Sequence, residues 1–252
     1  MPFGYIPHKT AYKNLILRIF GFPNLIRRIQ APVLMRMLDP RKDEVVLDAG
    51  CGAGFFTYEV ASGCLNSIGI DWNLNKDLSF TMGRRPKVAY VKGDVQKLPF
   101  VSGKFDKILL SSVLQMVRND KTLLKECYRV LKEKGILVLS VPIEYIHLKA
   151  LNRLKPQLQE KFGSLGKGYY DQGEVLRLLQ RQGFKITKTE YSPKKMGSLI
   201  FEIGLYLWYH FRFPFFSPFL FPVLYPIAYF DKFANNKQTG NELVIKAIKV
   251  LK

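Results

Sequence analysis

The segment that decides the fold of this 252-residue chain is Val45–Thr57, with the sequence VVLDAGCGAGFFT. Its first residues form a short apolar run, which is typical of a buried strand. A glycine-dense bend follows, and glycine lets the backbone take positive φ values and approach a ligand closely. From Phe55 to Gly63 apolar residues recur at helical spacing. The segment therefore predicts a strand, a tight turn and a helix.

The order of the glycines distinguishes two classes of cofactor-binding turn. A dinucleotide-binding turn follows the pattern G-x-G-x-x-G, but Phe55 stands where its third glycine belongs. Asp48 at the strand end and the glycines at positions 50, 52 and 54 give D-x-G-x-G-x-G instead. This pattern resembles motif I of class I S-adenosylmethionine (SAM) dependent methyltransferases.

Three further motifs of this family follow in the expected order. Asp71 ends a second short apolar run, near the spacing from Asp48 at which an acid meets a ribose. Gly93-Asp94-Val95 follows a third run, where the family places a carboxylate near the adenine amino group. Leu124–Gly135 closely resembles the segment before strand five in small-molecule methyltransferases related to quinone and sterol C-methyltransferases, the methyltransferase type 11 branch. The resemblance spans residues 45–142.

The resemblance implies an α/β fold with a seven-stranded, Rossmann-like, mostly parallel sheet and an antiparallel last strand. We expect residues 1–40 to form N-terminal amphipathic helices that act as a lid, and residues 41–192 plus 241–252 to form the SAM-binding domain. Residues 193–240 are a hydrophobic insert, rich in aromatic residues and proline, between strands six and seven. Expected strands lie at 45–47, 67–71, 88–91, within 105–116, and at 136–141, 184–191 and 242–250; expected helices include 119–132 and 171–182.

By the resemblance, SAM is the cofactor and the motifs supply its binding residues. The glycine turn shapes the site around the methionine part, and Asp48 organises its amino end. Asp71 binds the ribose and Asp94 the adenine, while Trp72 either lies against the adenine or simply packs. The expected cofactor-binding residues are Asp48, Gly50, Cys51, Gly52, Gly54, Asp71, Trp72, Asp94, Val95 and Ser111.

The acceptor side is less clearly marked. Ser111 and Ser112, at the exit of strand four, are expected near the transferred methyl group. Gln115 stands near the place where relatives often carry a histidine, which puts a proton-accepting role there in doubt. Three residues after strand five could deprotonate or orient an acceptor, although a lone histidine is more often structural. The expected catalytic residues are Ser111, Gln115, Glu144, Tyr145 and His147.

A net charge of +19 calls for an anionic partner, which is nucleic acid, lipid headgroups or an acidic substrate. Six basic and no acidic residues precede Asp39. Residues 11–38 are therefore either helices packed on the domain with a solvated basic face, or a lid that also touches an anionic membrane. The three cysteines show no metal-ligand spacing, so we expect reduced, buried thiols and no metal site. The first residues lack the apolar core of a signal peptide, which favours a cytoplasmic protein.

The insert is the most individual part of the sequence. Phe213–Phe230 carries no formal charge, but prolines recur every four residues from Pro214 to Pro226. Each proline costs about 3 kcal/mol inside a helix, so a regular membrane-spanning helix is not expected. The insert is either a folded subdomain that packs on the core, or a monotopic hairpin that lies at the headgroup boundary. We favour the hairpin, because so apolar a surface needs a partner.

The sequence is compatible with three functions. The first is a methyltransferase acting on a lipid-soluble or membrane-associated small molecule, such as a prenylated ring, an isoprenoid or a lipid headgroup, with peripheral contact to the membrane. The second is an RNA or other nucleic-acid methyltransferase, favoured by the charge and the aromatic residues. Against it, Ser111–Leu114 stands where enzymes that methylate base amino groups carry Asn/Asp-Pro-Pro-aromatic. The third is a non-catalytic, membrane-associated protein that keeps the SAM fold.

The hairpin interpretation predicts that the full chain stays on anionic liposomes after a high-salt wash. Deletion of residues 213–230 should abolish this retention, because the apolar contact does not depend on charge. Cosedimentation with anionic and with neutral vesicles measures it, and no binding to either kind of vesicle would contradict the interpretation.

Overall fold

The computed structural model describes residues 25–74, 88–143, 168–195, 197–200, 202–203, 206 and 240–250. The chain divides into two compact units. One consists of Met1–Pro32, Glu144–Gly163 and Tyr191–Glu242, and the other of Val33–Ile143, Ser164–Glu190 and Leu243–Lys252. The glycine turn and most of the sheet belong to the second unit. The core of the insert, including residues 213–230, lies outside the described residues, so the hairpin stays a prediction, as do the domain boundaries.

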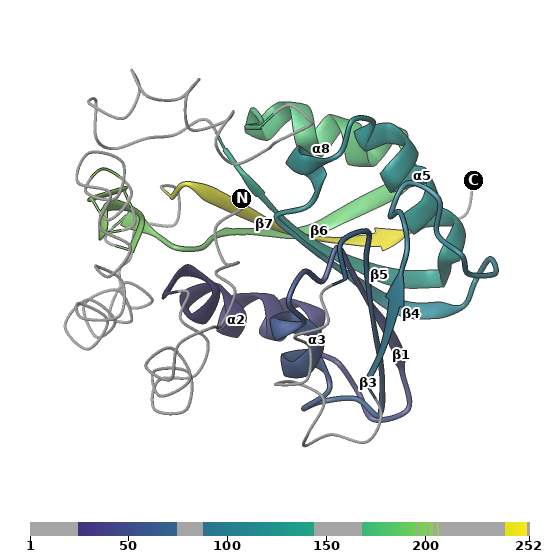
Figure 1. Cartoon of the computed structure of the whole chain (residues 1–252). Helices are drawn as coiled ribbons and strands as arrows, with labels where there is room; N and C mark the ends of the chain where they lie inside the picture. The colour runs from purple at the N-terminus through teal and green to yellow at the C-terminus, as the bar shows by residue number, and fades with distance from the viewer. Residues whose placement is uncertain are drawn as a thin grey trace, which may run out of the picture. The chain divides into compact units, whose positions relative to one another are not determined.

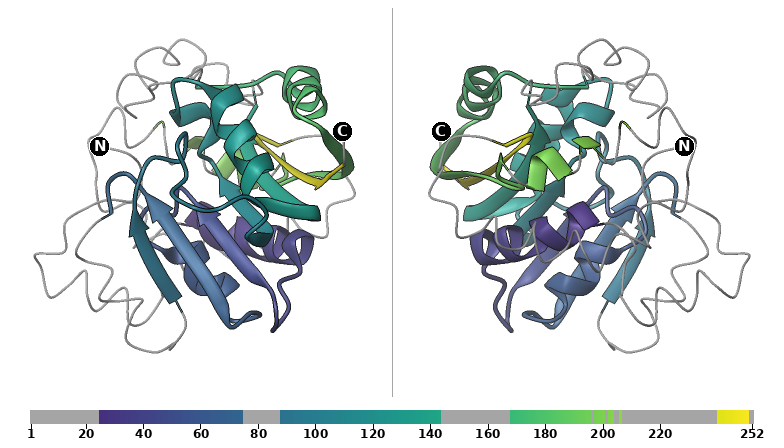
Figure 2. Two further views of the ribbon diagram at one scale, coloured as in Figure 1. Left: turned by 90° about the vertical axis from the view of Figure 1, so that its right-hand side faces the viewer. Right: turned by 90° about the vertical axis from the view of Figure 1, so that its left-hand side faces the viewer.

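Seven strands form a single sheet: β1 (Val45–Ala49), β2 (Asn66–Asp71), β3 (Val88–Lys92), β4 (Phe105–Ser111), β5 (Leu131–Pro142), β6 (Phe184–Tyr191) and β7 (Glu242–Lys249). Their order is β3-β2-β1-β4-β5-β7-β6 (Figures 1 and 2). Strands β1 to β5 pair in parallel with their neighbours. The last two strands are antiparallel, because the amide of Ser192 donates to the carbonyl of Glu242 while that of Val250 donates to the carbonyl of Gly183. The predicted α/β fold is confirmed.

The described helices are α2 (Leu25–Leu38), α3 (Phe55–Val60), the 3-10 helix η2 (Leu114–Met116), α5 (Asp120–Val130) and α8 (Gln172–Arg181). Helix α3 lies on one face of the sheet, and α5 and α8 lie on the other (Figure 1). The side chain of Asn119 accepts the amide of Thr122 at the start of α5, and that of Asp171 accepts the amide of Glu174 at the start of α8. Both helices therefore begin at the side-chain caps that their sequences predict.

The boundary between α5 and β5 differs from the prediction. The sequence pattern predicts a helix to Lys132 and a strand from Ile136, but the helix ends at Val130 and the strand begins at Leu131. Leu131 is extended, with φ −71° and ψ 139°, and it pairs with Phe105 on β4. Burial of Leu131 and this strand pairing outweigh the helical spacing of the sequence, which carries no information about the partner strand.

The central strands are buried on both faces. Two residues of β1 and three of β4 have no exposed surface: Val46, Leu47, Ile108, Leu109 and Leu110. Helices cover both faces of a parallel sheet, so its strands are continuous apolar runs. Full burial of each such side chain contributes about 1.5–3 kcal/mol. The strands thus form a rigid support, and the residues that follow their carboxyl ends are held at fixed positions.

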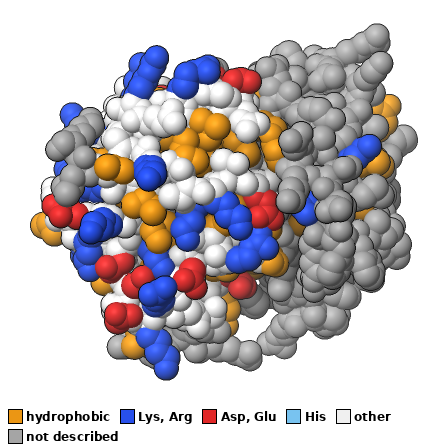
Figure 3. Space-filling view, turned by 180° about the vertical axis from the view of Figure 1, so that it is seen from behind, with side chains coloured by type: hydrophobic (Ala, Val, Ile, Leu, Met, Phe, Trp, Pro, Cys, Tyr) orange, Lys and Arg blue, Asp and Glu red, His pale blue; other side chains and the backbone are white. Residues whose placement is uncertain are grey.

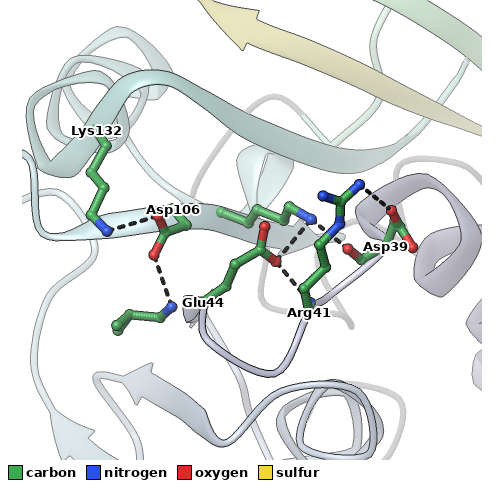
Figure 4. Close-up of polar contacts among 7 residues, drawn as sticks. Asp39, Arg41, Glu44, Asp106 and Lys132 are labelled. Carbon is green, nitrogen blue, oxygen red and sulfur yellow. Dashed lines mark hydrogen bonds and ion pairs between the residues drawn. The ribbon is translucent and has the colours of Figure 1, made fainter.

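Asp106 links three strands at their amino ends (Figure 4). Its carboxylate accepts a hydrogen bond from the main-chain amide of Val45 at 2.9 Å and one from Nζ of Lys132 at 2.7 Å. Val45 begins β1, Asp106 lies on β4, and Lys132 lies on β5. One carboxylate therefore satisfies a strand-end amide and a neighbouring cation together.

Lys107, the next residue, is a buried cation at the same end of the sheet. Its side chain is 5% exposed, and Nζ lies 2.9 Å from the carboxylate of Glu44. The same ammonium group donates to the main-chain carbonyl of Asp39. Removing one partner of a buried pair costs about 3–5 kcal/mol, so these contacts fix the turn before β1. They lie at the end of the strands opposite the glycine turn.

Asp106→Asn should lower the free energy of unfolding by about 1–2 kcal/mol at neutral pH, because the charge-assisted hydrogen bond from Lys132 is weakened. Burial raises the pKa of the Asp106 carboxyl, but the hydrogen bonds from Lys132 and Val45 outweigh this and hold the pKa below its ordinary value. A lowered folded-state pKa stabilises the fold above the ordinary pKa, and this stabilisation is lost as the pH falls through the folded-state value.

The difference between wild type and Asp106→Asn should therefore shrink as the pH is lowered towards this range. Urea unfolding of both proteins at neutral and at acidic pH measures it. A difference that does not change with pH would show that the charge of Asp106 does not contribute.

Candidate functional site

The glycine turn after β1 is held against the end of β2. The main-chain amides of Gly50 and Cys51 both donate to the carbonyl of Ile70, at 2.7 and 3.0 Å. Gly50, Gly52 and Gly54 have positive φ values of 78°, 55° and 81°. A residue with a Cβ is strained by about 1–2 kcal/mol in this conformation, which is why the turn is built from glycine.

The three glycines face different surroundings. A Cβ on Gly50 would come within 2.4 Å of Val113, and a Cβ on Gly54 within 2.5 Å of the hydroxyl of Tyr90. Both distances are far below van der Waals contact, so these glycines allow the turn to pack on neighbouring strands. A Cβ on Gly52 would meet no atom within 4 Å. Gly52 therefore presents its backbone to open space, as a ligand-binding turn requires.

Two carboxylates converge on this turn from neighbouring strands. Asp48, 1% exposed, accepts a hydrogen bond from the hydroxyl of Thr57 at 2.6 Å. Asp71, at the end of β2, accepts the amide of Gly52 at 2.9 Å through one oxygen and that of Asn73 at 2.9 Å through the other. Each carboxylate oxygen has a second lone pair, so the half-buried Asp71 can still accept ligand hydroxyl groups.

The third acid and the tryptophan lie beside Asp71. The amide of Gly93 donates to the carbonyl of Asp71 at 3.0 Å, so the turn that carries the exposed Asp94 starts next to it. Trp72 is 72% exposed, whereas Val95 is buried at 7%. A large exposed aromatic ring beside a turn with open space can stack on a ligand base. The structure thus brings the predicted residues of β1, β2 and β3 to neighbouring strand ends.

The acceptor-side residues are only partly described. The hydroxyl of Ser111 lies 3.3 Å from that of Ser140 on β5 and is buried. Ser112 follows with a positive φ of 54°, and its amide donates to the carbonyl of Ser140. Such backbone strain in a residue other than glycine is concentrated at functional sites. Gln115 is buried on η2. Glu144, Tyr145 and His147 lie outside the described residues, and all five catalytic assignments stay predictions.

The surroundings of Cys51, within the turn, disfavour its thiolate form. Burial, and then the charges of Asp48 and Asp71, raise the pKa of its thiol well above the ordinary value. Burial likewise raises the pKa of Cys64, and that of Cys127 to about 12. All three thiols are free, and Cys64 and Cys127 are buried while Cys51 is half-buried. Cys51 is among the predicted cofactor-binding residues, and its side chain lies half-buried in the turn.

Three residues that shape the turn are not among the predicted site residues. Thr57 orients Asp48, Tyr90 packs against Gly54, and Val113 packs against Gly50. Tyr90 and Val113 come from β3 and from the exit of β4, and no spacing in the sequence connects them with the glycines. Thr57 lies in the first turns of α3, and its position three residues after Gly54 is the one signal that points to it.

Residues 47–139 match the family described as methyltransferase domain. These residues form a methyltransferase domain. The matched part of this methyltransferase domain starts in β1 and ends in β5, so it contains the glycine turn, Asp71, Asp94 and Ser111.

Curated relatives of the methyltransferase domain carry several methyltransferase names. A demethylmenaquinone methyltransferase from Renibacterium salmoninarum is 29% identical over 139 residues, which are 52% of this chain and 58% of that protein. A malonyl-(acyl-carrier protein) O-methyltransferase from Enterobacter lignolyticus is 32% identical over 120 residues, 45% of each chain. The chain thus spans about half the length of the curated relatives it matches.

Solved structures share the fold of the methyltransferase domain. A SAM-dependent methyltransferase from Mesorhizobium loti superposes with a TM-score of 0.61 at 19% identity, covering 90% of this chain and 100% of that one. The cyclase SpnF superposes with a TM-score of 0.61 at 18% identity, covering 88% of this chain and 81% of that one. Because a cyclase has the same fold, the fold alone does not determine the activity.

SAM is the cofactor of this domain family, and the residues of the turn fit it. The open space at Gly52 leaves room for a ligand at the main chain, and Asp71 beside it offers carboxylate oxygens to a ribose diol. Among the described residues, no group of three or more His, Cys, Asp and Glu side chains is placed to hold a metal ion. The individual cofactor contacts stay predictions.

Gly52→Ala should abolish or strongly weaken SAM binding while costing about 1–2 kcal/mol of stability, because the new Cβ strains the turn and occupies the ligand side. Gly103→Ala is the matched control, since Gly103 also has a positive φ, 67°, and open space for a Cβ. It lies in the turn before β4, at the opposite end of the strands.

Isothermal titration with SAM and thermal unfolding of the two variants test this. Equal losses of stability with a loss of SAM affinity in Gly52→Ala alone are expected. Wild-type SAM affinity in Gly52→Ala would show that the cofactor does not approach the turn at this residue.

Proposed function

We propose that this chain transfers a methyl group from SAM to a lipid-soluble or membrane-associated small molecule. The observation that carries the proposal is the pairing of the Gly52 amide with Asp71 at 2.9 Å, which joins the glycine turn to the acid of β2. This pairing holds a carboxylate with spare lone pairs beside an open glycine backbone, which suits the binding of a ribose diol.

SAM, when bound, supplies a methyl group that its sulfonium already activates. The protein therefore has to bind SAM and the acceptor, orient them and exclude water. Asp71 and Asp94 would hold the adenosine end, and Asp48, fixed by Thr57, the amino end. The exit of β4 would face the methyl group through Ser112, whose strained backbone is fixed by Ser140. A rigid wall at this place aligns the acceptor in line with the departing sulfur.

Two observations support a small, lipid-soluble acceptor. The curated relatives named above include methyltransferases for demethylmenaquinone and for a malonyl group on acyl-carrier protein, which favours a small molecule over a nucleic acid. The insert follows β6 and carries the uncharged stretch at 213–230, which suits an apolar partner. In the described part of the chain no helix is long and apolar enough to cross a membrane. Peripheral contact with an anionic membrane at the cytoplasmic face is part of the proposal.

One face of the described residues lacks the charge pattern typical of a nucleic-acid-binding surface (Figure 3). On the face shown in Figure 3, the described Lys and Arg side chains are interspersed with Asp and Glu. A protein that follows a nucleic-acid backbone usually gathers its cations into a stripe. On this face the charges are mixed.

The proposed activity is tested by transfer of labelled methyl groups from SAM to two separate pools, a total lipid extract and total RNA. Asp71→Ala should abolish transfer because the ribose contact is lost. Asp43→Ala is the matched control, since it removes an exposed carboxylate in the turn before β1. We expect label in the lipid pool with the wild type and with Asp43→Ala, but not with Asp71→Ala.

Label in the RNA pool would overturn the acceptor class and assign the basic charge to nucleic-acid binding. No transfer to either pool, together with no SAM binding in titration, would overturn the methyltransferase activity itself. No transfer with SAM still bound would overturn the lipid acceptor and leave a water-soluble one.

A further inference from the structure

We propose that Glu126 and Arg129 of α5 are positioning residues for SAM, because they hold the main chain of the loop that carries Asp94. This inference rests on the proposed function and extends it to residues that do not touch the cofactor. The loop, residues 94–100, joins β3 to the segment before β4 and contains the predicted adenine-side acid.

The two side chains form a bidentate ion pair on the surface of the helix. Nε and Nη2 of Arg129 donate to the two carboxylate oxygens of Glu126, each at 2.8 Å. A planar guanidinium that faces a carboxylate in this way has a fixed orientation, unlike a lysine at the same position. The pair is half-buried, with 18% of the Glu126 side chain and 34% of the Arg129 side chain exposed. Its remaining donors and acceptors therefore point in defined directions.

Those remaining groups bind the loop through its backbone. Glu126 accepts the amide of Leu98 at 2.8 Å, and Arg129 donates to the carbonyls of Leu98 at 3.0 Å and Phe100 at 2.7 Å. Leu98 is thus held by both its amide and its carbonyl, and its side chain is buried. Because all three contacts involve main-chain atoms, the pair fixes the path of the loop whatever its side chains are.

The amino end of the same helix holds the loop at a second point. The main-chain amide of Asn119, the cap of α5, donates to the side-chain oxygen of Gln96 at 3.0 Å. The main-chain amide of Gln96 in turn donates to the carboxylate of Asp94 at 2.8 Å. The loop is therefore anchored to α5 on both sides of Lys97, through Gln96 and Leu98. Of these two residues, Gln96 orients the carboxylate of Asp94.

This arrangement explains why an exposed acid can have a defined position. Asp94 itself is on the surface, where a free carboxylate would sample many rotamers and lose entropy on binding a ligand. Holding its loop in advance removes part of that cost, which raises the affinity for the cofactor without adding a contact to it. The helix-to-loop contacts act through Asp94, so their loss should appear in SAM affinity and not only in stability.

The chain offers a matched control of the same chemistry in the pair of Asp106 and Lys132. Asp106 also bridges a main-chain amide, that of Val45 at 2.9 Å, and a cationic side chain, that of Lys132 at 2.7 Å. Its side chain is 25% exposed, close to the value for Glu126. Asp106→Asn should therefore cost stability as Glu126→Gln does, but among the described hydrogen bonds the Asp106 carboxylate makes none to residues 94–100.

The test compares Glu126→Gln, Arg129→Lys and Asp106→Asn with the wild type by isothermal titration with SAM and by thermal unfolding. Both variants of the pair should weaken SAM binding about tenfold, the order of one charge-assisted hydrogen bond. Asp106→Asn should lower the melting temperature but leave the SAM dissociation constant within about twofold of wild type. Amide hydrogen exchange without SAM should become faster at Leu98 in Glu126→Gln and stay unchanged in Asp106→Asn.

Equal SAM affinity in all three variants and the wild type would overturn the positioning role while the methyltransferase assignment stands. Equal weakening in all three would also overturn it, because the effect would then follow general stability. No SAM binding by the wild type would overturn the proposed function and the positioning role with it.

Discussion

The site depends on the close approach of the glycine turn to the end of β2. The carbonyl of Ile70 accepts two consecutive amides of the turn, and the carboxylate of Asp71 accepts a third from Gly52. These contacts require positive φ values at alternate residues and no Cβ on the side of Tyr90 or Val113. One local constraint therefore places the turn, the acid of β2 and an open backbone surface together.

The two ends of the sheet use charged groups for different purposes. At the amino ends, Asp106 and Lys107 form ion pairs with residues of neighbouring strands and turns. Their charges therefore stabilise the sheet. At the carboxyl ends, Asp71 and Asp94 accept only main-chain amides and a neighbouring amide side chain among the contacts described. A carboxylate bound by amides keeps spare lone pairs, and it remains available to a ligand.

Helix α5 packs against the sheet and also holds a loop of the candidate site. Its side chains hold the Asp94 loop through the pair of Glu126 and Arg129, and its cap holds Gln96. The hydrogen bonds from Arg129 and, to a lesser extent, from Leu98 hold the pKa of the Glu126 carboxyl below its ordinary value, although burial opposes this. The helix thus packs on β5 with one face and organises a loop of the site with another, which is how a stable core imposes geometry on exposed residues.

The sequence by itself determined the strand, turn and helix at Val45–Thr57, the seven-stranded α/β fold and the positions of Asp48, Asp71 and Asp94. The strand, turn and helix and the strand-end acids follow from local chemistry, since glycine spacing and apolar runs are visible within a few residues, whereas the seven-stranded fold follows from the resemblance of four consecutive motifs to a family. Only the tertiary structure decided that β5 begins at Leu131, that Tyr90 and Val113 pack on the glycines, and that Glu126 and Arg129 hold the Asp94 loop. Each of these joins residues far apart in the chain, where strand pairing and side-chain packing outweigh local preference and leave no periodic signal in the sequence.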